Sequence, residues 1–159
     1  MLSLSGRHYY ITGEMMNDIV KSDVIELETS GFGDTRDITG AVTAVLEKAG
    51  AKDGLVTVFC CGSTGTITTI EFEPGVIRDL REALEKVAPS DTPYHHDEAW
   101  HDGNGFSHVR AALMKPSLSV PLIGGKMVLG TWQQIVFIDF DNRPRKRKVV
   151  VQVIGTGKQ

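Results

Sequence analysis

Short strand-like segments that follow one another across tight turns are the feature that most constrains the fold of this chain. Residues 24–29 alternate apolar and charged side chains, which is typical of a strand with one face on a core. Further strands are predicted over 55–61, 66–72, 118–123, 127–140 and 148–154, with turns at 62–65, 124–125 and 141–145. Strands that come mostly as hairpins favour an antiparallel or mixed sheet over a doubly wound parallel one.

Helices are predicted between these strands. Asp37 is a candidate N-cap for a helix that stops at Gly50, where a residue in the left-handed region commonly ends a helix. Pro74 opens a second helix in the favoured first turn, and its inward side is predicted to carry Ile77, Leu80, Leu84 and Val87. Residues 90–105 indicate an irregular loop, and residues 106–114 a third helix. We therefore expect an α+β fold.

Length and composition indicate one domain. The 159 residues, 41% of them hydrophobic, suffice for a single core over 1–159, with residues 1–22 as a candidate N-terminal extension. The 17 basic and 20 acidic residues leave a net charge of -3, so no nucleic-acid surface is expected. The basic run 143–148 lacks interleaved aromatic residues, and we interpret it as a solvated turn and edge strand. No apolar run reaches the ~18 residues of a membrane span.

Cys60 and Cys61 are the only cysteines and are adjacent in the sequence. In an extended segment their side chains point to opposite faces, so they do not make a disulfide framework. We predict reduced, packed thiols and a cytoplasmic protein, while a reactive thiol and a strained vicinal disulfide remain alternatives.

Histidines and carboxylates concentrate between residues 95 and 108. The candidates are His95, His96, Asp97, His101, Asp102 and His108. Imidazoles and carboxylates can bind a metal, with a carboxylate fixing the tautomer of a ligating ring. No HExxH or paired CxxC motif is present, so solvated loop histidines and a core His108 are the alternative.

Two glycine-bounded segments could also contact a ligand. The backbone amides and hydroxyls of Ser63 and Thr64 could hold a phosphate, unless 62–65 is a plain hairpin turn. Thr131 and Gln133 share one face of the strand predicted over 127–140 and could present donors to a pocket.

Two glutamates flank Phe72 near the start of the second helix. Glu73 is interpreted as the cap of that helix, where negative charge is favourable. Glu71 lies at a strand end and could point into a site.

Three blocks of residues resemble the YjbQ family, small proteins named for a secondary thiamine-phosphate synthase activity. The first block runs from Ser63-Thr64-Gly65-Thr66-Ile67-Thr68 through Glu73-Pro74 to Arg78-Asp79-Leu80. The second comprises Tyr94-His95-His96-Asp97, Gly103-Asn104-Gly105 and His108-Val109-Arg110-Ala111. The third comprises Pro116-Ser117-Leu118-Ser119-Val120-Pro121 and Gly130-Thr131-Trp132-Gln133. Together they span roughly two-thirds of the chain.

The resemblance implies a compact α+β homotrimer with a polar site near the subunit boundary. It assigns the catalytic roles to Glu71, His96, His108, Thr131 and Gln133. His96 and His108 would also hold a divalent metal, Mg²⁺ or Zn²⁺, and further ligand contacts would come from Ser63, Thr64, Asp97 and Asn104. One position departs from the family pattern, because Gly62 stands where such proteins usually carry a histidine.

Two functions follow from this resemblance. The first is a thiamine-phosphate synthase-like transferase that joins a pyrimidine methyl diphosphate to a thiazole phosphate. Its leaving diphosphate requires cations, and Arg110 and Lys115 are the nearest candidates in the sequence. The second is a non-catalytic homotrimer that binds a metal or a small phosphorylated metabolite. Whether the chain is an enzyme stays open between the two.

Overall fold

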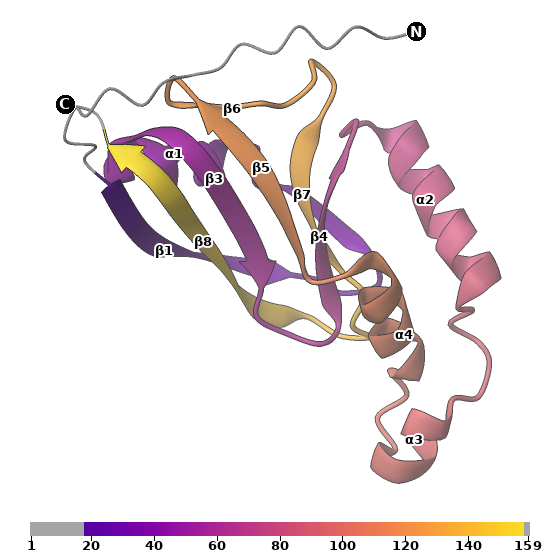
Figure 1. The fold of residues 1–159 in the computed structure, drawn as a ribbon. Coiled ribbons are helices and arrows are strands. Elements are labelled where there is room, and N and C mark those ends of the chain that lie inside the picture. Colours follow the sequence, from indigo (N-terminus) through magenta and orange to yellow (C-terminus); the bar gives the residue numbers. More distant parts are fainter. Residues whose placement is uncertain (1–17, 158–159) are drawn as a thin grey trace, which may run out of the picture.

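Two antiparallel sheets form the framework of the computed structural model, which describes residues 18–157 (Figure 1). The larger sheet has the order β1 (Asp18–Thr29), β8 (Arg145–Gly157), β3 (Ala51–Cys60), β5 (Ser117–Ile123) and β6 (Lys126–Met127). The smaller sheet has the order β2 (Asp34–Asp37), β7 (Gln134–Asp139) and β4 (Gly65–Ile70). The predicted α+β class with an antiparallel sheet is confirmed.

The main hydrophobic core lies between the two sheets. Alternate residues of β3, among them Val56 and Val58, are fully buried against Phe137 of β7 and Ile67 of β4. Helix α1 (Thr39–Ala49) contributes Val42 and Leu46 to the same core. The predicted N-cap Asp37 is one residue too early, because Ile38 holds the N-cap position of α1 without a side-chain cap. Asp37 still accepts a hydrogen bond from the Thr39 amide (2.8 Å), and Gly50 ends α1 in the left-handed region (φ 65°), as predicted.

A second apolar cluster lies on the other face of the smaller sheet. Val136 and Ile138 of β7 pack there against Leu84 of α2 (Pro74–Val87) and Ala111 of α4 (Gly105–Met114). Strand β7 is therefore buried on both faces. Glu73 caps α2 through the amides of Gly75 and Val76, as expected. The prediction that Val87 points inward is wrong, since that residue is 66% exposed.

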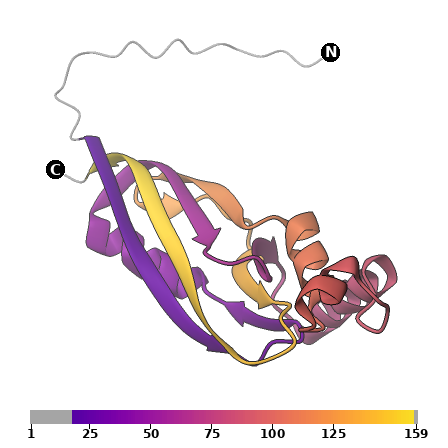
Figure 2. The ribbon, with the colours of Figure 1, turned by 90° about the horizontal axis from the view of Figure 1, so that it is seen from below.

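Helices α2, α4 and the short α3 (His95–Trp100) gather at one end of the molecule, away from the start of β1 and the end of β8 (Figure 2). The region 90–105 was expected to be irregular throughout, so the helical turn of α3 corrects that expectation. None of the helices within 18–157 is long and apolar enough to cross a membrane.

The predicted hairpin between β3 and β4 does not form. Strand β4 pairs with β7 in the smaller sheet, while β3 pairs with β5 and β8. The amide of Cys61 donates to Lys148 O (3.1 Å), and the amide of Phe140 donates to Thr64 O (2.9 Å). These bonds fasten the two sides of the connection to different sheets, so residues 61–64 cross from one sheet to the other.

The strand predicted over 127–140 is interrupted. Strand β6 ends at Met127 and β7 begins at Gln134, and the Gln133 amide donates to Gly130 O (3.0 Å) across the intervening turn. Hence Gly130 to Gln133 form a turn and not part of a strand. The expected turn at Gly124 and Gly125 is present, with φ values of 59° and 80°.

Both cysteines are free thiols, as predicted. Cys60 is buried, but Cys61 is exposed, so the prediction of a packed thiol is wrong for Cys61. Burial raises the pKa of the Cys60 thiol to about 11. Of the candidate N-terminal extension, residues 1–17 lie outside the described residues, and residues 18–22 are the start of β1.

Candidate functional site

A polar pocket of about 380 Å³ opens where α3 and α4 meet two turns of the sheets. The β3–β4 crossing brings Ser63 and Thr64 to it, and the chain around α3 and α4 brings two histidines. The turn between β7 and β8 supplies Asp141, and the start of β8 supplies Arg145 and Arg147. The complete lining is Gly62, Ser63, Thr64, His96, Trp100, Asp102, Asn104, His108, Asp141, Arg145 and Arg147.

His96 and His108 lie side by side in this pocket. Their ring centroids are 4.3 Å apart and the ring planes are tilted by 43°. His96 lies in α3 and His108 in the first turns of α4. The connection between the helices reverses through His101 (φ 55°) and Gly103 (φ 65°), both in the left-handed region. That reversal brings together two imidazoles that are twelve positions apart in the sequence.

Asn104 donates to the ring of His96 and to the neighbouring carboxylate of Asp102. The hydrogen-bonding pattern places the Asn104 amide nitrogen 3.3 Å from His96 Nε2 and 3.1 Å from Asp102 Oδ1. The Asp102 carboxylate itself is 3.6 Å from His96 Nε2, beyond an ordinary hydrogen bond. With Nε2 accepting from Asn104, the neutral ring of His96 carries its proton on Nδ1.

His108 is biased toward its neutral form. Burial lowers its pKa below the ordinary value of 6.5, and the nearby charge of His96 lowers it further. Asp102, Asp141 and Asp97 act in the opposite direction without restoring it. At neutral pH the pocket therefore holds an uncharged imidazole at His108.

Arg147 is the most deeply placed cation of the pocket, with a side chain only 10% exposed. Its Nε donates to Asp139 (2.7 Å), and its Nη2 donates to Asp139 (2.6 Å) and to Thr64 Oγ1 (2.8 Å). Burial alone would lower the pKa of Arg147, but the hydrogen bonds and charge of Asp139, together with Asp141, raise it. Thr29 completes the network by donating to Asp139. The guanidinium is thus charged and held in one orientation.

Arg145 lies next to it on the pocket wall. Its Nε donates to Asp141 Oδ2 (2.7 Å), which also accepts from Thr64 Oγ1 (3.1 Å). Burial would raise the pKa of Asp141, yet hydrogen bonds from Arg145 and Thr64 outweigh it and lower that pKa. Because the Thr64 hydroxyl already bonds Arg147 and Asp141, Thr64 positions the arginine and has little capacity left for a ligand.

The alternation along β8 explains why sequence reasoning missed these arginines. Residues 145 and 147 point inward, in line with the buried Val149 and Val151, whereas Lys146 and Lys148 point outward. The lysines lie 3.5 Å from Glu28 and 3.4 Å from Glu26 on the outer face. Interpreting the whole basic run as a solvated turn and edge strand was therefore wrong for Arg145 and Arg147, although Arg143 is exposed as expected. Strand β8 also lies between β1 and β3 and is not an edge strand. Their period-two spacing ahead of Val149 is the signal that could have found them.

Arg110 and Lys115, the cations expected from the sequence, do not line the pocket. Arg110 donates to Ala88 O through both Nε (2.9 Å) and Nη2 (2.7 Å) and pairs with Glu85 (2.7 Å), so it ties α4 to the end of α2. Lys115 ends α4 and is not part of the lining.

Of the predicted ligand contacts, Ser63, Thr64 and Asn104 do line the pocket, whereas Asp97 does not. Asp97 Oδ1 instead accepts a hydrogen bond from the Gly105 amide (3.0 Å) at the start of α4. It therefore helps to set the position of His108 from outside the pocket wall.

Three predicted catalytic residues lie away from the histidines within one chain. Glu71 follows the far end of β4, whose six residues at ~3.3 Å each separate its ends by ~17 Å. Gln133 Nε2 donates to Thr69 Oγ1 (3.3 Å), and Gln133 lines a separate groove of about 290 Å³ between β4 and β5. Thr131 is exposed in the adjacent turn. Within one chain, Thr131 and Gln133 therefore do not line the pocket that holds the two imidazoles.

The donor atoms of the pocket do not converge on one point where a metal ion could bind. Within residues 18–157, no three His, Cys, Asp or Glu side chains converge closely enough to hold an ion. His96, His108 and Asp102 are the donors nearest to such a set, and the two rings face each other in a tilted stack. His96, His108 and Asp102 of one chain thus do not form a metal centre in this arrangement. The divalent ion expected from the resemblance stays a prediction.

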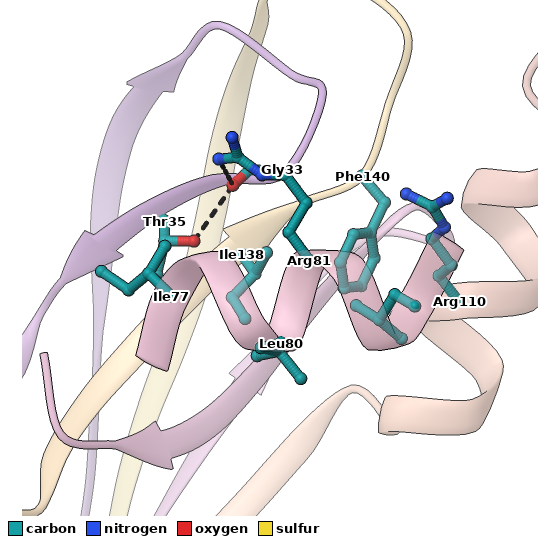
Figure 3. A pocket seen from close by; sticks show the side chains of 9 residues that line it. Gly33, Thr35, Ile77, Leu80, Arg81, Arg110, Ile138 and Phe140 are labelled. Atoms are coloured by element: carbon teal, nitrogen blue, oxygen red, sulfur yellow. Dashed lines mark hydrogen bonds between the residues drawn. The ribbon is translucent and has the colours of Figure 1, made fainter. Parts of the chain in front are cut away.

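A second hollow lies between α2 and the smaller sheet (Figure 3). Its volume of about 10 Å³ has room for no more than a single water. Arg81 reaches across it and donates to Gly33 O (3.2 Å), beside the apolar side chains of Ile77, Leu80 and Phe140. The hollow is a packing gap under α2 and not a ligand site.

Comparisons with known proteins agree with the fold and with the expected family. A family model described as UPF0047 protein YjbQ-like matches residues 23–156. A UPF0047 protein of Methanothermobacter thermautotrophicus is 40% identical over 136 residues, covering 86% of this chain and 93% of the relative. The UPF0047 protein YugU of Bacillus subtilis is 30% identical over 133 residues, covering 82% and 97%.

Solved structures give the same result. A YjbQ/UPF0047 family protein of Clostridium acetobutylicum superimposes with a TM-score of 0.76 at 39% identity, covering 83% of this chain and 99% of that one. A YbjQ-like protein of Sulfolobus solfataricus superimposes with a TM-score of 0.82 at 28% identity, covering 87% and 99%. With sequence relatives and structural neighbours in agreement over most of its length, this chain belongs to the YjbQ (UPF0047) family.

Proposed function

We propose that the chain is a small-molecule enzyme whose pocket binds the phosphate groups of its substrate. The observation that carries this proposal is that Arg145 and Arg147 line the same pocket as the paired rings of His96 and His108. Fixed guanidinium groups suit phosphate oxygens, because their N–H groups match them in geometry and charge. The exposed ring of Trp100 at the rim provides a flat apolar surface for the rest of such a molecule.

The activity we propose is the thiamine-phosphate synthase type named by the family resemblance. In that reaction the bond between the pyrimidine methylene carbon and diphosphate breaks, and a bond from the thiazole nitrogen to that carbon forms. Negative charge builds up on the departing diphosphate, where Arg145 and Arg147 would stabilise it. The thiazole nitrogen replaces diphosphate on the methylene carbon without losing a proton, so the reaction requires no general base. The imidazoles would then act as hydrogen-bonding groups.

An assay with purified protein tests this activity. The protein is supplied with pyrimidine methyl diphosphate and thiazole phosphate, with and without Mg²⁺, and thiamine phosphate is measured. Arg145→Ala and the double variant His96→Ala, His108→Ala should lose most of the product, whereas Arg78→Ala, at an exposed position on α2, should keep it. Absence of product from the unaltered protein under all conditions would reject the enzyme proposal.

A non-catalytic phosphometabolite-binding protein is the second candidate. The observation that favours it is the distance of Glu71, Thr131 and Gln133 from the imidazoles within one chain. Calorimetric titration with inorganic pyrophosphate separates the two functions. Binding that depends on Arg145, without turnover of the paired substrates, supports the binding protein over the enzyme.

We further propose that the chain assembles as a homotrimer with the pocket near the subunit boundary. The support is the outer face of the larger sheet, where Val20, Leu55, Phe59 and Ile154 are 43–67% exposed in neighbouring strands. A second copy of the chain covering this face would bury them. Light scattering at micromolar concentration should give three times the chain mass, and a monomer mass would refute the trimer.

We also propose that His96 and His108 bind a divalent ion and that the protein is cytoplasmic. Elemental analysis of protein purified without chelators or affinity tags measures the ion. Stoichiometric metal that survives in the His96→Ala, His108→Ala variant would refute these two ligands. The two free thiols of Cys60 and Cys61 are in keeping with a reducing compartment.

A further inference from the structure

Gly62 occupies a position whose backbone does not call for glycine. It is absent from the glycines with positive φ, so an L-residue could adopt its conformation without strain. The reason for glycine at this position lies in the side chains around it. A β-carbon placed on Gly62 would lie 3.3 Å from Nη1 of Arg147, tighter than ordinary van der Waals contact, and 3.9 Å from Cys60 Sγ. The absence of a side chain at residue 62 therefore leaves the end of Arg147 uncovered.

Nη1 is the one terminal nitrogen of Arg147 left over from the buried network. Nε and Nη2 bond Asp139, Thr64 and Asp141, while Nη1 makes no hydrogen bond to any group within residues 18–157. In the same part of the chain, no fully buried side-chain nitrogen or oxygen lacks a partner. Nη1 therefore keeps some exposure although nine-tenths of the side chain is buried, and it lies beside Gly62, which lines the pocket.

We infer that Gly62 is a specificity-determining residue, because it exposes Nη1 of Arg147 as the contact for a phosphate oxygen of the ligand. This inference rests on the proposed function, in which the pocket binds phosphate groups. A guanidinium whose other nitrogens are already fixed loses little conformational entropy when it binds, so its free N–H groups are a preorganised anion contact. Any side chain at residue 62 would extend over that contact.

A thermodynamic cycle on phosphate binding tests the inference. Inorganic pyrophosphate is titrated calorimetrically, at constant ionic strength, into the unaltered protein, Gly62→Val, Arg147→Lys and the double variant. Gly62→Val should weaken binding about tenfold or more, the scale of one charge-assisted hydrogen bond. The double variant should bind no more weakly than Arg147→Lys alone, because both changes remove the same contact. Gly40→Ala is the control, since a β-carbon there meets nothing within 4 Å.

The outcomes separate this inference from the proposal on which it rests. If the unaltered protein does not bind pyrophosphate, the proposed function fails. If it binds, and Gly62→Val binds equally well or its loss adds in full to that of Arg147→Lys, the inference alone fails. Arg147→Lys disturbs a buried ion pair and could prevent folding. In that event the side-chain nitrogen resonances of Arg147 decide: pyrophosphate should shift them in the unaltered protein and not in Gly62→Val, and equal shifts in both would overturn the inference.

Discussion

The fold shifts the protonation of His108 in the pocket. Burial, and then the charge of His96, lower its pKa below 6.5, against the opposing effect of Asp102, Asp141 and Asp97. The unfolded chain therefore binds more protons than the folded chain in the window just below pH 6.5. Stability should rise with pH through that window and fall as the medium becomes more acidic than pH 6.5.

The expected result is a loss of unfolding free energy on going from about pH 7.5 to about pH 5.5, and a smaller loss in His108→Gln. Urea denaturation at each pH measures it. His101→Asn is the matched control, because His101 is exposed and asparagine tolerates its left-handed backbone. Identical pH profiles for the unaltered protein and His108→Gln would contradict the assignment. The carboxylates with lowered pKa, such as Asp141, lose their contribution at more acidic pH and so do not obscure this window.

The residues of the site were only partly predictable from the sequence. His96, His108, Ser63, Thr64 and Asn104 were indicated by their motifs and do line one pocket. Local spacing could not show that the two rings touch, since the contact depends on the reversal after α3. The inward arginines were missed because the five basic residues of 143–148 resemble a solvated segment until strand β8, which divides them between two faces, is recognised.

At the scale of elements, boundaries and caps were more predictable than partners. Glu73 begins α2 and Gly50 ends α1 where local chemistry predicts it, because capping involves only neighbouring residues. The pairing of β4 with β7 depends on bonds such as that from Phe140 to Thr64, far apart in the sequence. A run of β-branched residues predicts a strand but does not identify the strand beside it.

The end of α4 offers a test of local strain. Lys115 has φ 68° and ψ 156°, a region almost confined to glycine, and its carbonyl accepts a hydrogen bond from Thr66. Lys115→Gly should relieve about 1–3 kcal/mol of strain and raise the melting temperature by several degrees. Lys115→Ala keeps the β-carbon and should give no such gain. Thermal unfolding followed by circular dichroism measures both variants, and an equal effect of glycine and alanine would contradict the strain.

At the scale of the whole molecule, the two groups of predicted site residues lie at opposite ends of β4. His96 and His108 are at the end near Gly65, and Glu71 and Gln133 are at the end near Ile70. A single chain cannot bring them together without dismantling the smaller sheet. The homotrimer we propose offers a direct resolution, because one chain could present its imidazoles to the glutamate and glutamine of the next.

Mixed oligomers test this arrangement. One variant carries His96→Ala and His108→Ala, the other Glu71→Gln and Gln133→Ala, and each alone should be inactive in thiamine phosphate formation. Co-expressed in equal amounts, they should recover about a quarter of the unaltered activity, since random assembly joins an intact half from each of two neighbours at that frequency.

Co-expression of the two single variants His96→Ala and His108→Ala is the matched control. Both changes lie in the same half of the site, so no pairing of neighbouring chains restores it. If activity recovers only in the mixture of the histidine variant with the Glu71→Gln, Gln133→Ala variant, the site is shared between chains. The pocket lined by His96 and His108 is then one half of that site. If neither mixture recovers activity while the unaltered protein is active, each chain works alone, and Glu71 and Gln133 act on the fold or the assembly and not on the substrate.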